Sequence, residues 1–90
     1  MTSRLHPSFQ RQLAALPKDV QERARSAYKQ FVSNPRHPSL QFKQLNAGHA
    51  LWSVRVTNDY RAVGVRSADK IIWFFIGTHA QYDRLLKTYR

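Results

Sequence analysis

Chemically active side chains follow directly after the most apolar stretch of the chain. Ile71–Ile76 is a run of six bulky apolar residues, and Gly77 and Thr78 lead from it to His79. A buried strand fixes the backbone, Gly77 would allow a sharp turn out of it, and the next residues reach solvent from a rigid base. Because imidazole can donate or accept a proton near neutral pH, the pattern predicts an acid–base catalyst at His79. The alternative is that Thr78 and His79 only cap the following helix.

Two helices are expected in the first part of the chain. The sequence His-Pro-Ser at 6–8 is typical of a helix start, and apolar residues then recur at helical spacing. Asp19 and Glu22 resemble a capping box, and the apolar residues of 20–31 form one stripe. Asn34-Pro35 is expected to end this second helix, because proline disfavours helical geometry in the residue before it.

From Leu40 onward the period of the apolar residues changes to two, which is typical of strands. The alternating segments Trp52–Val56 and Tyr60–Arg66 are separated by a short polar loop and predict a hairpin. A second turn leads to a strand over 71–77, which is apolar on both faces and therefore belongs in the middle of a sheet. Residues 79–89 suit a short helix.

Helices grouped before hairpin-linked strands predict an α+β domain of two layers. The helical pair would pack on an antiparallel sheet of three or four strands, the short helix would come last, and residues 2–5 could close one more short strand. Ninety residues make one domain, so residues 1–90 are expected to form a single domain. Because the helical pair can cover only one face of a small sheet, basic side chains can gather on the opposite face.

The chain is strongly basic, with 15 Lys and Arg against five Asp and Glu and a formal net charge of +10. The bases are spread over both halves, so the folded domain favours a polyanion such as RNA or DNA. An acidic protein partner and a merely soluble basic domain are the alternatives. The absence of cysteine excludes disulfides, thiolate nucleophiles and cysteine-rich zinc sites. Without a signal-peptide pattern or an apolar run of about 20 residues, we expect a cytoplasmic protein that does not enter a membrane.

The block from Trp52 to Leu86 is specific enough to suggest a family. WSVRVTNDYRAVG, a short turn and IIWFFIGTHAQYDRLL resemble the C-terminal half of the RelE/ParE superfamily of bacterial toxins. PSFQRQLAALP and the long helix after it are similar to the helical pair of that superfamily, whose usual first strand would have to come from Thr2–Leu5. The G-T-H ending of the last strand resembles the RelE-like and YafQ-like ribonucleases, whereas ParE-type gyrase inhibitors usually carry no such histidine.

The resemblance implies a RelE-like microbial ribonuclease fold and a metal-independent endoribonuclease, an mRNA interferase. Such an enzyme would cut mRNA, commonly on the ribosome, and leave a 2′,3′-cyclic phosphate or 3′-phosphate and a 5′-OH. A cognate antitoxin would neutralise it, and the toxin–antitoxin hetero-oligomer would bind operator DNA through the antitoxin. The chain has no HExxH and no paired carboxylate cluster, so no metal or other cofactor is expected. The alternatives are a non-catalytic inhibitor of DNA gyrase and a basic nucleic-acid-binding module without catalysis.

The same resemblance suggests roles for individual residues. His79 matches the C-terminal catalytic histidine of the family and would act as general acid. Arg61 matches an arginine that would hold the scissile phosphate, although it shares strand parity with apolar neighbours. Arg55 aligns with a histidine of the YafQ-like group and would provide a second phosphate contact. Asp59 matches an aspartate of that group and would orient a base, or it is an ordinary hairpin residue.

Five further residues complete the predicted site. Tyr82 would stack on a base or contact phosphate, or it packs into the last helix. Lys43 and His49 lie where RelE-like toxins place basic residues, and the general base stays open among Lys43, His49 and Asp59. His49 is equally an ordinary turn residue. The basic side chains expected to bind RNA are Arg55, Lys43, Arg84 and Lys87.

Overall fold

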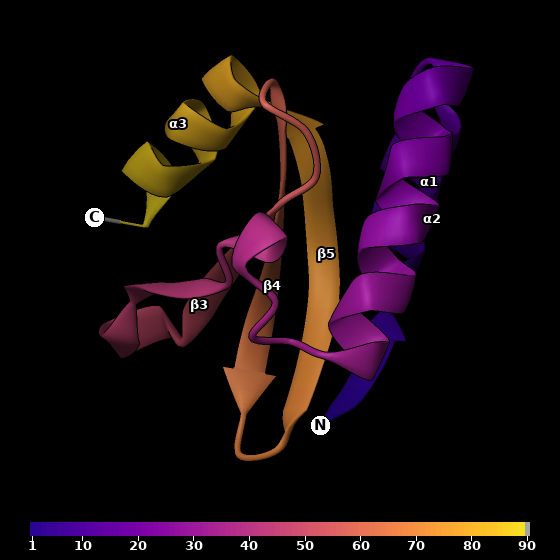
Figure 1. Ribbon diagram of the computed structural model, residues 1–90. Helices are drawn as coiled ribbons and strands as arrows, with labels where there is room; N and C mark the ends of the chain where they lie inside the picture. The colour runs from indigo at the N-terminus through magenta and orange to yellow at the C-terminus, as the bar shows by residue number, and fades with distance from the viewer. Residues whose placement is uncertain (90) are drawn as a thin grey trace.

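One sheet of five strands forms the centre of the protein, and helices lie on both sides of it (Figure 1). The structure is a computed structural model that describes residues 1–89. The strands are arranged in the order β1-β5-β4-β3-β2. In chain order the elements are β1 (Thr2–Leu5), α1 (Pro7–Ala14), α2 (Lys18–Ser33), the short 3-10 helix η1 (Pro38–Leu40), β2 (Lys43–Asn46), the 3-10 helix η2 (Ala47–His49), β3 (Leu51–Arg55), β4 (Tyr60–Ser67), β5 (Lys70–Thr78) and α3 (His79–Thr88).

The predicted hairpins are confirmed, and the sheet has one strand more than the three or four expected. β2, β3, β4 and β5 pair antiparallel in sequence. Residues 2–5 form the additional strand β1, which pairs parallel to β5 from Thr2 opposite Lys70 to Leu5 opposite Trp73. This edge strand has only four residues and a partner far along the chain, so its local pattern is weak. β5 has a neighbour on each side, as its apolar sequence predicted.

The helices α1 and α2 cover one face of the sheet. The start of α1 agrees with the sequence, because the His6 imidazole accepts a hydrogen bond from the backbone N–H of Ser8 at 3.1 Å. Gln12 connects α1 to β5: its amide nitrogen donates to the Phe74 carbonyl at 3.1 Å, and its oxygen accepts from the Ile76 N–H at 3.1 Å. Among residues 1–89, no helix is long and apolar enough to cross a membrane.

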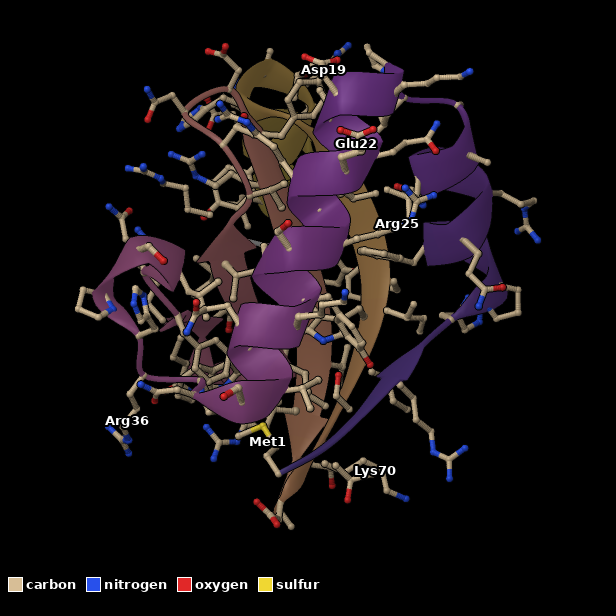
Figure 2. All side chains as sticks on the ribbon, turned by 45° about the vertical axis from the view of Figure 1, so that its right-hand side comes forward. Met1, Asp19, Glu22, Arg25, Arg36 and Lys70 are labelled. Atoms are coloured by element: carbon tan, nitrogen blue, oxygen red, sulfur yellow. The ribbon has the colours of Figure 1, made fainter. Side chains whose placement is uncertain are left out.

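Two local details differ from the sequence prediction. The capping box at Asp19 and Glu22 does not form, because α2 already begins at Lys18 and Pro17 takes the cap position without a side-chain bond. Asp19 and Glu22 instead project from the first turns of α2 (Figure 2). The strand expected from Leu40 begins only at Lys43, because Gln41 adopts a left-handed conformation, with φ of 46°, that interrupts extended backbone.

The protein has two apolar cores, one on each face of the sheet. The larger contains Phe9, Phe31 and Trp73 and joins α1 and α2 to the sheet. The smaller contains Leu51, Val63 and Tyr82 and lies under α3. The sequence analysis left the face opposite the helical pair open for basic side chains. In the structure, α3 covers part of that face (Figure 1).

Candidate active site

His79 is the first residue of α3 and is fixed by its backbone. Its N–H donates to the Asp59 carbonyl in the β3–β4 loop at 2.8 Å. The cap of α3 is formed by its neighbours: Thr78 Oγ1 accepts from the Gln81 N–H at 3.2 Å, and Gln81 Oε1 accepts from the Thr78 N–H at 2.8 Å. Thr78 therefore caps the helix, as one alternative predicted, but the His79 imidazole takes no part in the cap.

Gly77 serves this cap in a way that differs from the expected sharp turn. Its φ is not positive, so the turn itself does not require glycine. A Cβ at position 77 would come within 2.5 Å of Gln81 Oε1 and within 2.9 Å of the Phe75 ring. Glycine is needed here so that the Gln81 side chain can reach back to the strand end.

The His79 side chain is exposed and paired at one ring nitrogen. Nδ1 lies 3.3 Å from Asp83 Oδ2, one helical turn along α3, and the two side chains are 53% and 56% exposed. Within residues 1–89, Nε2 has no hydrogen-bond partner, so it remains available to a substrate. Asp83 was not predicted as a site residue; the signal was its position four residues after His79 on a helix, where side chains meet.

Arg61 is positioned by the loop that precedes it. Its Nη1 donates to the carbonyls of Thr57 at 2.6 Å, Tyr60 at 3.0 Å and Asn58 at 3.3 Å. Among the described residues, its Nε and Nη2 have no partner. The guanidinium thus stabilises the loop with one nitrogen and keeps its other edge for an anion.

The pairing of the strands brings Arg61 and Arg55 together. They are directly opposite each other in β3 and β4, so their Cβ atoms leave the same face of the sheet, and Arg55 also borders a hollow beside Arg23 and Gln30 of α2. Lys43 pairs with Ser53, two residues before Arg55, and so lies on the same face. Like charges directly opposite each other destabilise a sheet. The three loop hydrogen bonds of Arg61 offset part of this repulsion.

Tyr82 lies under α3 rather than at a free surface. It is only 6% exposed, and it packs with Leu51 and Val63. Its hydroxyl lies 3.5 Å from Ser53 Oγ, and its ring centroid lies 5.5 Å from that of His79. The structure favours the packing alternative for Tyr82, because a buried ring cannot stack on a base.

The remaining predicted residues are distributed along α3 and its surroundings. Asp59 is an exposed loop residue whose backbone carbonyl holds His79. His49 lies against Tyr89, with ring centroids 5.2 Å apart, at the C-terminal end of α3. A helix of ten residues is about 15 Å long, so the structure does not bring His49 together with His79. Arg84 and Lys87 are exposed on α3. Among residues 1–89, no three His, Asp or Glu side chains form a group that could hold a metal ion.

A sequence model of the ParE-like toxin domain matches residues 18–84. The chain belongs to the ParE-like toxin domain family. This membership confirms the RelE/ParE resemblance, which therefore extends over most of the toxin domain. No curated protein matches the toxin in sequence.

Solved structures of the superfamily share the fold of this toxin. A chain of the RelB–RelE antitoxin–toxin complex from Methanococcus jannaschii matches with a TM-score of 0.71 and 20% identity, over 89% of this chain and 95% of that one. YafQ from E. coli strain BL21(DE3) matches with 0.70 and 12%, over 89% and 94%. The YoeB/ParE toxin from Agrobacterium tumefaciens matches with 0.67 and 15%, over 88% and 99%. At these identities the likeness establishes the RelE-like α+β fold.

Proposed function

We propose that this toxin is a metal-independent endoribonuclease that cleaves mRNA. One observation carries the proposal: an exposed histidine with a free Nε2 starts α3, beside a strand pair in which two arginines lie directly opposite each other. The histidine is held from both sides, by the Asp59 carbonyl and by Asp83. Such a fixed acid–base group next to fixed cations is what phosphodiester cleavage requires.

The reaction would proceed through attack of the ribose 2′-oxygen on the adjacent phosphorus. The 2′-OH loses its proton to a base, the bond from phosphorus to the 5′-oxygen breaks, and protonated His79 donates its Nε2 proton to the leaving 5′-oxygen. The products are a 2′,3′-cyclic phosphate and a 5′-OH. Arg55 and the free edge of Arg61 would stabilise the extra negative charge on the phosphate oxygens in the transition state.

The general base is best sought close to His79. His49 is separated from it by the length of α3, about 15 Å, which is too far for one phosphodiester. Lys43 is exposed on the same sheet face as the arginine pair, and the Asp59 carboxylate belongs to the loop that holds His79. Asp59 is therefore the first candidate, and Lys43 is the second because β2 lies three strand spacings, about 14 Å, from β5.

The partners follow from charge and from the related structures. Solved relatives include antitoxin–toxin complexes, so we propose a cognate antitoxin that covers the basic face. The net charge of +10 suits both an acidic antitoxin segment and mRNA on the ribosome. The toxin–antitoxin complex would reach operator DNA through the antitoxin.

A gyrase inhibitor of the ParE type is the second candidate, because the family model that matches is named after ParE. One experiment separates the two functions. The toxin is added to a purified translation system with a defined mRNA, the RNA ends are mapped, and DNA supercoiling by gyrase is measured in parallel. New 5′-OH ends that disappear with His79→Ala support the endoribonuclease. Intact mRNA together with blocked supercoiling would establish the gyrase inhibitor instead.

The metal independence needs a separate arm, because ribosomes themselves require magnesium. Cleavage of a susceptible free RNA should proceed in EDTA, or equally well with magnesium and with cobalt hexammine. Cleavage that appears only with a transition metal would contradict the proposed mechanism.

A further inference from the structure

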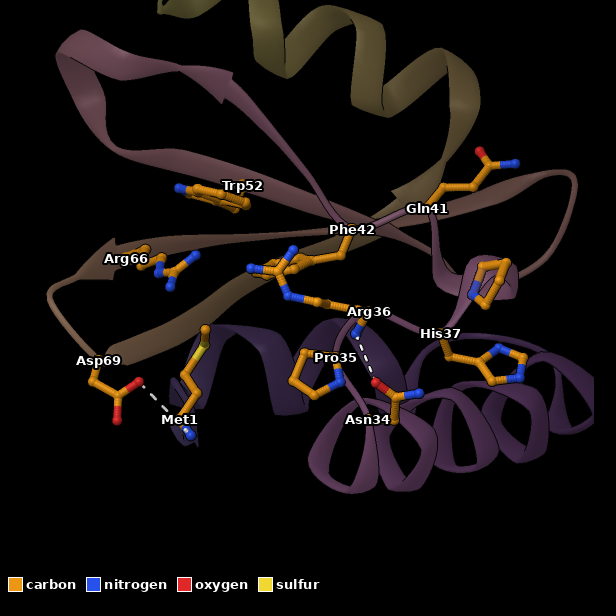
Figure 3. A pocket seen from close by; sticks show the side chains of 11 residues that line it. Met1, Asn34, Pro35, Arg36, His37, Gln41, Phe42, Trp52, Arg66 and Asp69 are labelled. Carbon is orange, nitrogen blue, oxygen red and sulfur yellow. Dashed lines mark hydrogen bonds and ion pairs between the residues drawn. The ribbon is translucent and has the colours of Figure 1, made fainter.

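A cavity of about 520 Å³ lies away from His79, between the sheet and the end of α2 (Figure 3). Phe42, Trp52 and Arg66 line its sheet side, and Arg36 lines it from the loop after α2. Its volume lies within the range of about 300–1,000 Å³ that small-molecule sites occupy. Arg66 pairs with buried Ile71 and so faces the helical side of the sheet. It lies five residues from Arg61, about 16 Å along β4, so the cavity is separate from the site at His79.

The sheet side of the cavity is a layer of stacked planar groups. The rings of Phe42 and Trp52 are 4.7 Å apart between centroids with an angle of 34° between their planes. The Arg66 guanidinium carbon lies 4.6 Å from the Trp52 ring centroid and 5.9 Å from that of Phe42. Arg66 Nε donates to the Ala68 carbonyl at 3.3 Å. The guanidinium is therefore held over the rings without any ligand.

The charges in the cavity favour an anion. Arg36 reaches across Phe42 in the view of Figure 3, and its backbone N–H is fixed by Asn34 Oδ1 at 3.2 Å. Among residues 1–89, no carboxylate lies within ion-pair distance of the Arg36 or Arg66 guanidinium. Asp69 also lines the cavity, but its Oδ1 lies 3.8 Å from the N-terminal nitrogen of Met1. Two cations thus face one cavity beside aromatic rings.

We propose that this cavity binds a nucleotide, as a second nucleic-acid site distinct from the cleavage site. The base would stack on the layer formed by Arg66 and Trp52, since guanidinium and aromatic planes both stack on bases. The phosphate would bind Arg36 and the free edge of Arg66, whose forked donors fit phosphate oxygens. An acidic peptide would supply negative charge for the two arginines but no planar base to stack on Arg66 and Trp52. The nucleotide is either free in solution or part of an RNA strand.

The proposal is tested on the intact wild-type protein by NMR of the backbone amides and the Trp52 indole. The probes are AMP, inorganic phosphate and a 5′-phosphorylated 2′-O-methyl RNA tetranucleotide, whose blocked 2′-oxygens prevent cleavage. AMP is expected to shift resonances at 34–42, Trp52 and 66–69, and to bind at least tenfold more tightly than phosphate. Tighter binding of the tetranucleotide than of AMP identifies RNA as the source, and equal binding identifies a free nucleotide.

Three charge-matched variants refine the test. Arg66→Gln should weaken AMP binding at least tenfold and Arg36→Gln several-fold. Arg11→Gln, which removes the same charge from an exposed position on α1, should change binding less than twofold. The spectrum of each variant also reports whether it is folded. Arg66→Lys, which keeps the charge without the plane, should give an intermediate affinity.

Several results would overturn the proposal. Equal affinity for AMP and phosphate would show that the cavity does not recognise the base. Equal losses of affinity in the three glutamine variants would show that binding is unspecific charge attraction. Shifts confined to 55–61 and His79 would mean that nucleotides bind only at the cleavage site. If AMP shifts nothing while an antitoxin protects residues 34–42, the cavity is a protein interface. Because binding is measured without cleavage, none of these results depends on the endoribonuclease activity.

Discussion

The two ends of α3 each place a histidine against an aromatic ring, but only one end has the neighbours that chemistry requires. His79 meets Tyr82 at 5.5 Å and 67°, and His49 meets Tyr89 at 5.2 Å and 68°. His79 follows a strand paired on both sides and has Asp83 at its Nδ1. His49 ends a 3-10 helix in a loop. Exposure and an aromatic contact therefore do not distinguish the two histidines, and the proposed acid–base role of His79 rests on its other neighbours.

The surrounding hydrogen bonds show what each end is built for. At the C-terminal end, Asn46 donates from Nδ2 to the Tyr89 carbonyl at 2.9 Å and accepts from the His49 N–H at 3.3 Å. These bonds close the helix and use His49 only through its backbone. At the N-terminal end, Thr78 and Gln81 close the helix, which leaves the His79 side chain free for another task. The comparison predicts that the two histidines respond differently to the same substitution.

The largest expected effect is the loss of His79. His79→Ala should lower the rate of RNA cleavage by about 10²–10⁴-fold, which is the usual contribution of one general acid or base. RNA binding should change little, because it rests on the many Lys and Arg contacts. His49→Ala is the matched control and should stay within about threefold of the wild type. Single-turnover cleavage and binding titrations check both, and equal losses in the two variants would remove the distinction between the ends of α3.

The substitution His79→Asn sharpens the same comparison. If His79 only capped α3, His79→Asn should behave like the wild type, because Asn is a good helix cap. Since Thr78 and Gln81 already make the cap, we expect His79→Asn to be as inactive as His79→Ala, with a melting temperature near that of the wild type. Full activity of His79→Asn would show that the imidazole is not the acid.

The next effect separates the two opposed arginines. Arg61→Ala should cost about 2.7–4 kcal/mol of transition-state stabilisation and should also lower the melting temperature, because three loop carbonyls lose their donor. Arg55→Ala should also slow cleavage, but it should leave stability equal or higher because a like-charge repulsion is removed. Arg61→Lys should rescue activity only in part. Cleavage rates and melting curves decide this, and if Arg61→Ala only unfolds the domain, Arg61 is a structural residue.

A smaller effect is expected at the helix cap. Thr78→Ala should lower the free energy of unfolding by about 1 kcal/mol, since it removes the acceptor of the Gln81 N–H. Cleavage per folded molecule should fall less than in His79→Ala, because the Asp59 carbonyl still holds the His79 backbone. Urea denaturation and active-site-normalised rates measure the two quantities. A loss of activity as large as that of His79→Ala would mean that the cap, rather than the imidazole, controls the reaction.

The smallest effect is expected for the hydroxyl of Tyr82. Tyr82→Phe removes one 3.5 Å contact to Ser53 and keeps the buried ring, so stability should fall by no more than about 1 kcal/mol and cleavage should stay within a few-fold of the wild type. Cleavage rates and melting curves measure both. A 100-fold slower cleavage by folded Tyr82→Phe would show that the Tyr82 hydroxyl takes part in the reaction.

The sequence was sufficient for the elements whose residues are neighbours along the chain. Period-two and helical spacing located β3, β4, β5 and α2, and the apolar run before His79 located the end of β5. β1 was only suggested, because four residues carry little pattern and its partner is β5. The cover that α3 provides over the second sheet face depends on packing of Tyr82 with Leu51 and Val63, which local spacing does not reveal.

For the candidate site, the sequence suggested residues but not the contacts that those residues make. His79 is fixed by the strand before it, which is a local feature. Three features depend on contacts between elements: the hydrogen bonds from Arg61 Nη1 to loop carbonyls, the burial of Tyr82, and the distance between His49 and His79. The cavity beside Trp52 and Arg66 was missed for the same reason, because β3, β4 and the loop after α2 meet only in the folded chain.

The central claim, that His79 is the general acid, is tested most directly by changing the leaving group. In an RNA with sulfur in place of the scissile 5′-oxygen, the leaving group departs as a thiolate. It hardly needs a proton donor, because thiols are much stronger acids than alcohols. Wild type and His79→Ala are compared on the oxygen and sulfur substrates in single-turnover reactions. We expect the loss of about 10²–10⁴-fold on the oxygen substrate to shrink to a few-fold on the sulfur substrate. An equally large loss on both substrates would contradict the account.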